Sequence, residues 1–236
     1  MKILAIDTTA TAASVAVAEE NKIIGESFIN TKITHSQTLM PMIEQLLKNT
    51  GLNIKDDIDA IAINAGPGSF TGVRIGVAAT KGLAFADSKP CISVSTLYSM
   101  AFNMIDTDCI VCAVMDARCS QVYNALFRCS GGTIERLTDD RALSLDELFE
   151  DLQNYNEKVF LVGDGAEICN NNFGDKLNNV QIANFCNRIQ KATSVAYAAF
   201  SLYKQGLTMT PEELMPTYLR LPQAQRELNK KMGVKQ

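Results

Sequence analysis

The 236-residue sequence has little of the material from which metal and nucleic-acid sites are usually built. It holds a single histidine, and its 22 lysines and arginines are outnumbered by 26 aspartates and glutamates, which gives a formal net charge of −4. One histidine without a suitable cysteine cluster argues against a zinc or iron site. The acidic balance argues against a surface that holds the phosphates of a nucleic acid unaided. We therefore expect no metal ligands, and contact with RNA only through another protein.

Long apolar segments are also missing. No run approaches the ~20 apolar residues that a membrane helix needs, and the opening MKILAIDTT is interrupted by Asp7, unlike a signal peptide. The seven cysteines lack the even count and the short, loop-rich context of a secreted disulfide framework. Cys109 and Cys112 have redox or metal spacing, but residues three apart in a strand point to opposite faces, which favours buried structural thiols. We expect a cytoplasmic, reduced protein without a membrane partner.

What is present is a pattern of strands and helices that occurs twice. In the first half, the strand KILAIDTT ends at Asp7 and is followed by the hairpin SVAVAEE and KIIGESF and by a helix that Gly51 ends. The strand IDAIAINAG, a helix over about 70–86, the strand PCISVS and the helix TLYSMAFNM complete this half. The second half restarts with CIVCAVMDAR, which ends at Asp116, and continues with SQVYNALFRC, IERL, the helix LSLDELFEDLQ, the strand KVFLVGDGAE and the closing helix KATSVAYAAFSLYKQG.

Two halves of the form β-β-β-α-β-α predict an α/β fold of two similar lobes with a cleft between them. This plan resembles the actin, sugar-kinase and Hsp70 superfamily, whose lobes are ribonuclease H-like. We assign residues 1–102 to an N-terminal lobe, 103–215 to a C-terminal lobe and 216–236 to a tail.

The stretch NAGPGSFTGVRIG, Asn64 to Gly76, is the densest glycine cluster. A loop between a strand end and a helix start exposes unpaired N–H groups and can hold an anion. However, Val73 and Arg74 follow Gly72 where a P-loop needs lysine and then serine or threonine. A phosphate cradle and a close approach of two backbones both remain open. The possible nucleotide or anion contacts are Asp7, Thr8, Thr9, Gly66, Gly68 and Ser69.

The two long helices of the first half are apolar over more of their surface than one sheet can cover. A stripe of about 100° suffices to face a single sheet, and small residues on a helix allow another helix to pack closely. Burial inside one lobe is the alternative, but two neighbouring helices with this excess favour a protein–protein interface. The residues predicted to line it are Leu39, Met40, Met42, Ile43, Leu47, Gly72, Ile75, Gly76, Ala79, Gly82 and Leu83.

The sequence shows no convincing set of catalytic residues. His35 begins a helix, where a lone histidine more often caps or packs, and Ser36 and Ser69 have no partnered histidine and aspartate in sequence. Asp7 and Asp116 could hold Mg²⁺ across a cleft, but neither is followed by the glycine turn that nucleotide-binding relatives of this plan use. We predict no catalytic residues.

The chain resembles the TsaB family in ILAIDTT, HSQTLMPMI, NAGPGSFTGVRIG, VMDAR with QVYNALF after it, and PTYLR, which together span nearly its whole length. The resemblance implies a non-catalytic partner of TsaD in the synthesis of N6-threonylcarbamoyladenosine (t6A) on tRNA. It implies a heterodimer built from the first-lobe helices and work alongside the ATPase TsaE and with TsaC. It also implies that tRNA is met only through the complex. A homodimer through the same surface is expected when TsaD is absent.

TsaD itself carries a metal through a His-x-x-x-His pair and a late aspartate. In this sequence Thr96 and Met100 stand at the matching positions of PCISVSTLYSM, and Thr193 stands near the third. The resemblance therefore implies no cofactor of this chain's own, with ATP, ADP or Mg²⁺ expected only at an interface shared within the complex. The alternative is an independent ATP-binding hydrolase or kinase that uses Asp7 and Asp116. A peptidase has only an older family label in its favour.

Overall fold

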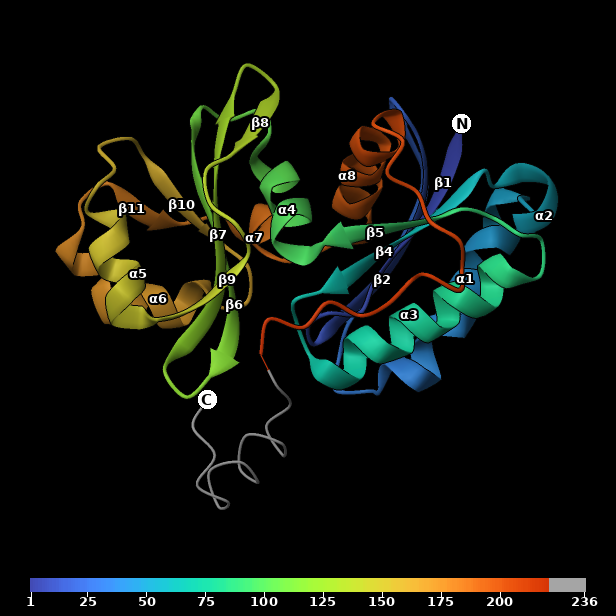
Figure 1. Cartoon of the computed structure of the whole chain (residues 1–236), viewed down its shortest axis with the longest axis horizontal. Helices are drawn as coiled ribbons and strands as arrows, with labels where there is room; N and C mark the ends of the chain where they lie inside the picture. Colours follow the sequence, from blue (N-terminus) through green and yellow to red (C-terminus); the bar gives the residue numbers. More distant parts are fainter. Residues whose placement is uncertain (221–236) are drawn as a thin grey trace.

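The computed structural model describes residues 1–220, which form two α/β lobes side by side (Figure 1). The strands of the first sheet are β1 (Lys2–Asp7), β2 (Ala12–Glu19), β3 (Lys22–Asn30), β4 (Ala60–Gly66) and β5 (Cys91–Ser95). Those of the second are β6 (Cys109–Arg118), β7 (Gln121–Ser130), β8 (Thr133–Arg136), β9 (Arg141–Ser144), β10 (Val159–Val162) and β11 (Val180–Ile182). The helices are α1 (His35–Thr50), α2 (Ile54–Asp57), α3 (Phe70–Phe85), α4 (Thr96–Ala101), α5 (Leu145–Leu152), α6 (Ala166–Phe173), α7 (Phe185–Arg188) and α8 (Ala192–Lys204), with 3₁₀ turns η1 (Phe102–Met104) and η2 (Gly174–Lys176).

The two sheets have the same topology. The first has the order β3-β2-β1-β4-β5, and the second has the matching order β8-β7-β6-β10-β11, with β9 added beside β7. In each sheet the three hairpin strands are antiparallel and the two later strands run parallel to the first. The predicted duplication is therefore confirmed, and the second half contains a short parallel strand, β11, that the sequence pattern did not reveal.

Helices cover both faces of each sheet, and each half of the sequence contributes one helix to the sheet of the other half. One face of the first sheet packs on α1 and α3, and the other face packs on α8, whose alanines and Val195 are fully buried. The second sheet packs on α5 and α6 on one face and on α4 on the other. Thus α4, from the first half of the sequence, covers the second sheet, while α8, from the second half, covers the first (Figure 1).

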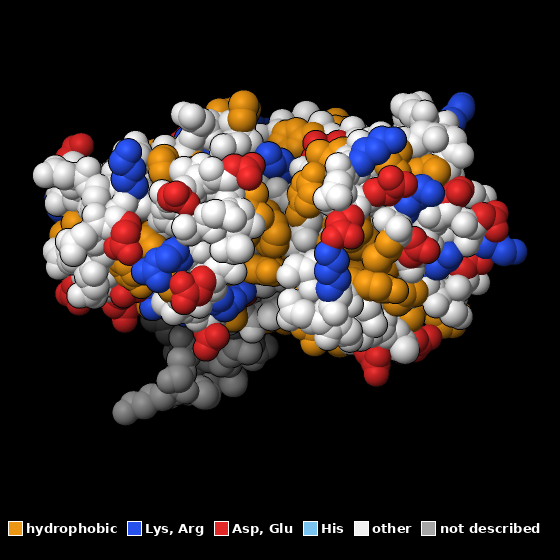
Figure 2. All heavy atoms as spheres, turned by 90° about the horizontal axis from the view of Figure 1, so that it is seen from above, with side chains coloured by type: hydrophobic (Ala, Val, Ile, Leu, Met, Phe, Trp, Pro, Cys, Tyr) orange, Lys and Arg blue, Asp and Glu red, His pale blue; other side chains and the backbone are white. Residues whose placement is uncertain are grey.

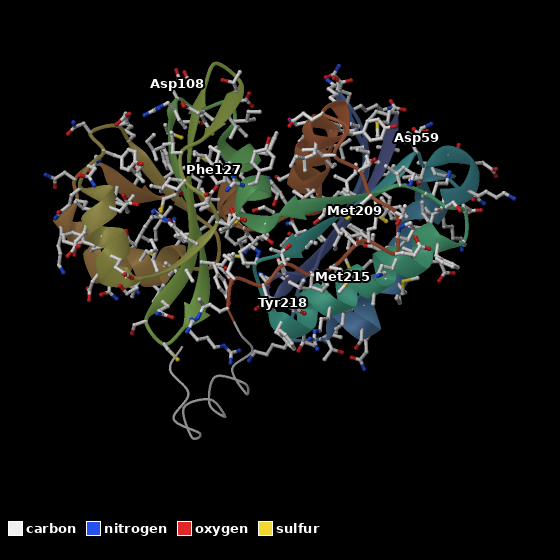
Figure 3. All side chains as sticks on the ribbon, in the orientation of Figure 1. Asp59, Asp108, Phe127, Met209, Met215 and Tyr218 are labelled. Carbon is white, nitrogen blue, oxygen red and sulfur yellow. The ribbon has the colours of Figure 1, made fainter. Side chains whose placement is uncertain are left out.

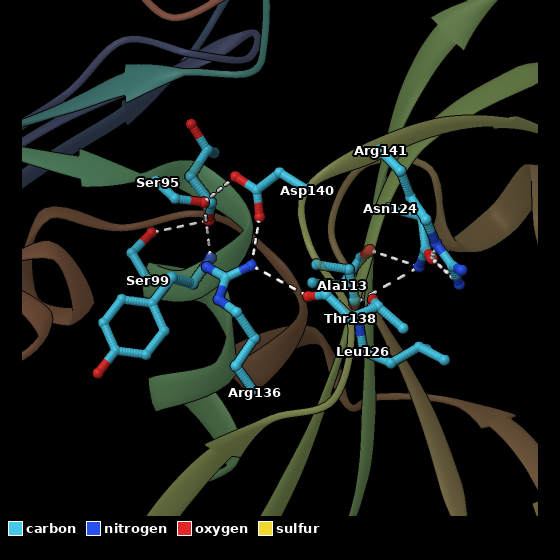
Figure 4. A network of polar contacts seen from close by, with 12 residues as sticks. Ser95, Ser99, Ala113, Asn124, Leu126, Arg136, Thr138, Asp140 and Arg141 are labelled. Carbon is cyan, nitrogen blue, oxygen red and sulfur yellow. Dashed lines mark hydrogen bonds and ion pairs between the residues drawn. The ribbon is translucent and has the colours of Figure 1, made fainter. Parts of the chain in front are cut away.

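Polar contacts join the lobes near α4. The hydroxyl of Ser95, which caps α4, donates to the carboxylate of Asp140 in the second lobe, and Arg136 pairs with the same carboxylate at 2.6 Å (Figure 4). Beside them, and within the second lobe, the buried Asn124 donates to the carbonyl oxygen of Ala113 and accepts from the guanidinium of Arg141 (Figure 4). The division at residues 102 and 103 stays a prediction, because these contacts and the exchanged helices tie both halves together.

The described part of the tail, residues 216–220, continues a segment that returns to the first lobe after α8. The rest of the tail that we assign from the sequence, residues 221–236, lies outside the described residues. No helix within residues 1–220 is long and apolar enough to cross a membrane. Basic and acidic side chains are interspersed on the face seen in Figure 2, with no uniformly basic area on it.

Candidate functional site

A cleft between the lobes contains a cavity of about 770 Å³. The first lobe contributes the turn after β1, the residues around the start of α1 and the start of α3. The second contributes the end of β6, Tyr123 of β7 and Asp164 after β10, and the segment after α8 adds Tyr218 and Arg220. The charged residues that line it are Lys32, Asp116, Arg118, Asp164 and Arg220, and His35 lines it as well. The cavity is therefore polar and has both signs of charge.

Asp7 lies at the end of β1 but does not line this cavity. The carboxylate is 1% exposed and accepts hydrogen bonds from the backbone N–H of Thr9 at 2.8 Å, from the Thr9 hydroxyl at 2.9 Å and from the side-chain amide of Asn64. Burial raises the pKa of Asp7, and these hydrogen bonds oppose the rise. The arrangement ties the turn after β1 to β4 and leaves the Asp7 carboxylate outside the cavity.

Asp116 occupies the equivalent position at the end of β6 and is exposed in the cleft. Its carboxylate accepts from the backbone N–H of Arg118 at 2.7 Å, the same turn that Asp7 makes with Thr9. Asp164 lies in the same lobe, just after β10, the strand that pairs with β6. Although this residue stays accessible to solvent, the protein around it displaces much of its water, which raises its pKa to about 6. A hydrogen bond from Gln190 at 3.2 Å opposes that shift, and the charges of Asp116 and Asp7 add to it.

Backbone from other parts of the protein packs closely against the glycine loop. Gly66 has a φ of 125°, and a Cβ there would collide with the carbonyl oxygen of Thr217. A Cβ on Gly68 would lie 2.6 Å from the carbonyl oxygen of Thr9. The N–H of Ser69 donates to that same oxygen at 2.7 Å. These contacts account for the glycines by close backbone approach. Of the predicted anion contacts, Thr9, Gly68 and Ser69 line the cavity, whereas Asp7, Thr8 and Gly66 do not; contact with a nucleotide stays a prediction.

Gly72 and Gly76 of α3 face inward. A Cβ on Gly72 would meet the carbonyl oxygen of Thr8, and one on Gly76 would meet the Thr8 hydroxyl and the Cδ1 of Ile63. The Thr8 hydroxyl also donates to the carbonyl oxygen of Gly72 at 2.8 Å. The interpretation of these two glycines as a face for another protein's helix is therefore wrong, because they bring α3 against the end of β1 and against β4 of the same lobe.

The other predicted interface residues divide into two groups. Leu39, Met42 and Ile43 are buried in the core beneath α1 and are not available to a partner. Six residues are exposed or half-buried, and we call them the outer face: Met40, Leu47, Ile75, Ala79, Gly82 and Leu83. A Cβ added to Gly82 would have no atom of the described residues within 4 Å. Whether this outer face is an interface stays a prediction.

The segment after α8 also belongs to this region, which the sequence pattern did not predict. Leu214 is fully buried in the first-lobe core, and Lys81 of α3 donates to its carbonyl oxygen at 3.1 Å. Arg74 donates to the hydroxyl of Tyr218 at 2.7 Å and lies 3.8 Å from the ring centre of Phe70. Figure 3 shows Met209, Met215 and Tyr218 following α3 towards the cleft. The only signal in the sequence was PTYLR, one of the motifs that carried the resemblance.

The other residues considered from the sequence, His35 and the three at the positions of the TsaD metal ligands, make contacts within the protein or are buried. The Nε2 atom of His35 lies 2.8 Å from the carbonyl oxygen of Ala10, which joins the start of α1 to the turn after β1. Thr96, Met100 and Thr193 are buried, and the hydroxyl of Thr193 donates to Glu26 at 3.2 Å. Within residues 1–220, no three His, Cys, Asp or Glu side chains are grouped to hold a metal ion.

Comparison with known proteins identifies the family. The model of the family described as TsaD, tRNA N6-adenosine threonylcarbamoyltransferase, matches residues 22–228. The tRNA threonylcarbamoyladenosine biosynthesis protein TsaB of Bacillus subtilis is 30% identical over 226 residues, which cover 95% of this chain and 96% of that protein. This chain belongs to the TsaB family.

A further TsaB relative agrees in sequence, and a solved structure agrees in fold. TsaB of Haemophilus influenzae is 32% identical over 233 residues, covering 93% of this chain and 94% of its own. A Pseudomonas aeruginosa crystal structure, described as an uncharacterized protein with similarity to the peptidase YeaZ, matches with a TM-score of 0.79 at 27% identity over 93% of this chain and 99% of that chain. The predicted fold of two similar α/β lobes is thereby confirmed.

Proposed function

We propose that this chain is a non-catalytic subunit of the t6A system, which binds TsaD through the outer face and stabilises the active form of that transferase. The relatives of nearly full length are named tRNA threonylcarbamoyladenosine biosynthesis proteins, and this supports a role in that pathway. The observation that carries the binding mode is the outer face itself, where Met40 is 46% exposed and Gly82 is open beside apolar neighbours.

The remaining partners follow from this assignment. The TsaE ATPase and TsaC act with the pair, tRNA is met through the complex, and a homodimer forms through the outer face in the absence of TsaD. ATP, ADP and Mg²⁺ bind only at an interface shared within the complex, and the protein works in the cytoplasm. The burial of Thr96 and Met100 supports a chain without transferase chemistry of its own.

The test is co-purification with TsaD and an assay of threonylcarbamoyl transfer with and without this chain. Gly82→Arg places a long cation on the outer face where the described residues leave space, and it removes a glycine from a helix interior, which by itself favours folding by about 1 kcal/mol. We expect a folded variant that no longer binds TsaD or stimulates transfer. Gly76→Arg is unsuitable because it would also disrupt the packing against Thr8.

The matched control is Asn171→Arg on α6, which adds the same charge to an exposed helix position of the second lobe. It should bind TsaD as the parent chain does. Normal binding by Gly82→Arg would rule out the outer face as the interface, while transfer that is independent of the whole chain would rule out the role in t6A synthesis.

An independent ATP-binding hydrolase or kinase is the competing function, and the polar cleft is the feature in its favour. Asp7 is buried outside the cavity, so such an enzyme would have to use Asp116 and Asp164. Calorimetry with Mg-ATP distinguishes the two. Micromolar binding and turnover by the isolated chain, lost in Asp116→Ala, would replace our proposal.

A further inference from the structure

Two cysteines from neighbouring strands lie opposite each other in the second lobe. Cys109 begins β6, Cys129 lies near the end of β7, and the two are partners in the antiparallel register. Both are buried in the core between the second sheet and α4. Cys112 instead packs in the core on the opposite face of the sheet. The C-x-x-C spacing thus separates its two thiols, whereas folding brings together two that are distant in sequence.

The two thiols interact directly and unequally. A hydrogen bond from Cys129 lowers the pKa of Cys109, although burial and the charge of Asp108 oppose this shift. The same contact, together with burial, raises the pKa of Cys129. Cys129 Sγ also lies 3.7 Å from the carbonyl oxygen of Ala101 in α4. These opposite directions favour the thiolate at Cys109, and the strand register places Cys129 directly opposite it, where a resolving cysteine has to be.

The backbone spacing allows these sulfur atoms to bond. Opposite residues of antiparallel strands have Cα atoms about 4.5 or 5.5 Å apart, depending on the type of pair. Natural disulfides join Cα atoms roughly 4.4–6.8 Å apart, so either type of pair is compatible. All seven cysteines are free thiols in the structure.

We propose that Cys109 and Cys129 form a peroxide-sensitive dithiol that closes to a disulfide between β6 and β7. The Cys109 thiolate attacks one oxygen of hydrogen peroxide, the O–O bond breaks, hydroxide leaves, and Cys109 becomes a sulfenic acid. The sulfur of Cys129 then attacks the sulfur of Cys109, and the S–O bond breaks as the hydroxyl group leaves with the Cys129 proton as water. Together the two thiols lose two electrons and two protons, and one peroxide becomes two waters.

The location suits a small oxidant. Cys109 is 5% exposed and follows Asp108, which Figure 3 shows at the margin of the lobe. The figure also shows Phe127 between the sheet and α4, in the core that covers the pair. A peroxide molecule can reach the strand end through a small local opening, whereas a bulky disulfide such as oxidised glutathione requires a larger one.

The test uses the reduced full-length chain, treated with hydrogen peroxide, quenched with catalase, unfolded and alkylated with iodoacetamide. Peptide mass spectrometry should find Cys109 linked to Cys129, with the link reversed by dithiothreitol. The oxidised chain should unfold at a temperature higher by roughly 5 °C or more, because the disulfide restricts the unfolded chain. Recovery of both cysteines as alkylated thiols, or links confined to the exposed Cys119 and Cys186, would overturn the proposal.

Two variants separate the pair from general thiol oxidation. In Cys129→Ala, Cys109 should persist as a sulfenic acid that dimedone traps. Cys112→Ala removes an equally buried thiol from the other face of β6 and should still yield the Cys109–Cys129 link. Loss of the link in Cys112→Ala, in a chain that remains folded, would contradict the assignment. If Cys129→Ala does not fold, the parent chain and Cys112→Ala still decide the result.

Discussion

The ends of β1 and β6 are equivalent in topology but differ in what surrounds them. Asp7 and Asp116 make the same turn, with hydrogen bonds of 2.8 and 2.7 Å from the N–H two residues later. Asp7 is 1% exposed, whereas Asp116 opens into the cleft. Asp7 is buried because the glycine loop, α3 and Asn64 all pack against the turn after β1.

The difference shows that a repeated fold offers the same position twice but does not give it the same role. In the first lobe the chain itself occupies the space around the aspartate turn, and the segment after α8 closes the region by packing on α3 and on Gly66. In the second lobe the corresponding space belongs to the cavity. The Asp7 carboxylate therefore acts in stability, whereas the Asp116 carboxylate is the one that a solute in the cavity can reach.

Leu214→Ala tests the closing segment and should have the largest effect. Leu214 is fully buried in the first-lobe core, so truncation leaves a cavity beside α3. We expect a loss of about 3 kcal/mol in the free energy of unfolding, measured by urea denaturation. Met215→Ala, at a neighbouring position that is 64% exposed, should change it by less than about 0.5 kcal/mol. Equal effects would show that the segment does not close the first lobe.

Asp7→Ala and Asp116→Ala compare the two turns directly. Without the Asp7 carboxylate, the N–H of Thr9 and the amide of Asn64 lose their buried acceptor. This should reduce the free energy of unfolding by about 2 kcal/mol. Removing the exposed Asp116 carboxylate should change it by less than about 0.5 kcal/mol. The same urea measurement checks both, and a larger loss for Asp116→Ala would reverse the roles that we assign to the turns.

Much of the fold was predictable because strands and helices leave periodic patterns. The two aspartate-ended strands, the hairpins and the glycine stops at Gly51 and Gly206 were all visible, and both glycines have the positive φ expected of a helix end, 68° and 75°. The exchange of α4 and α8 was not predictable. Apolar periodicity shows that a helix has a buried face but does not show which sheet covers it.

The candidate site was less predictable than the fold. A helix with small residues permits a close approach, but the sequence does not say whether the neighbour is another protein or, as for Gly72 and Gly76, the Thr8 turn of the same lobe. The segment with Leu214 and Tyr218 has no regular period, so its packing on α3 left only the PTYLR motif as a trace. Asp164 was overlooked because its environment depends on residues brought together from several elements.

Asp164→Asn tests the solvent-accessible cavity residues of the second lobe and should have the smallest effect on the free energy of unfolding. Its folded-state pKa of about 6 lies above the ordinary value of 3.8, so between these pH values the folded chain binds a proton that the unfolded chain has lost. Raising the pH through this window removes that proton and lowers the stability of the parent relative to Asp164→Asn. Because Asp164 remains accessible to solvent, we expect a relative change below about 1 kcal/mol in urea unfolding between about pH 4 and pH 7.

Gln190→Met removes the hydrogen bond that favours the charged form and should raise the Asp164 midpoint further in a carboxyl NMR titration. A midpoint near 3.8 in the parent, unmoved by Gln190→Met, would show that the cleft side chains are fully hydrated and that the two turns differ in burial alone.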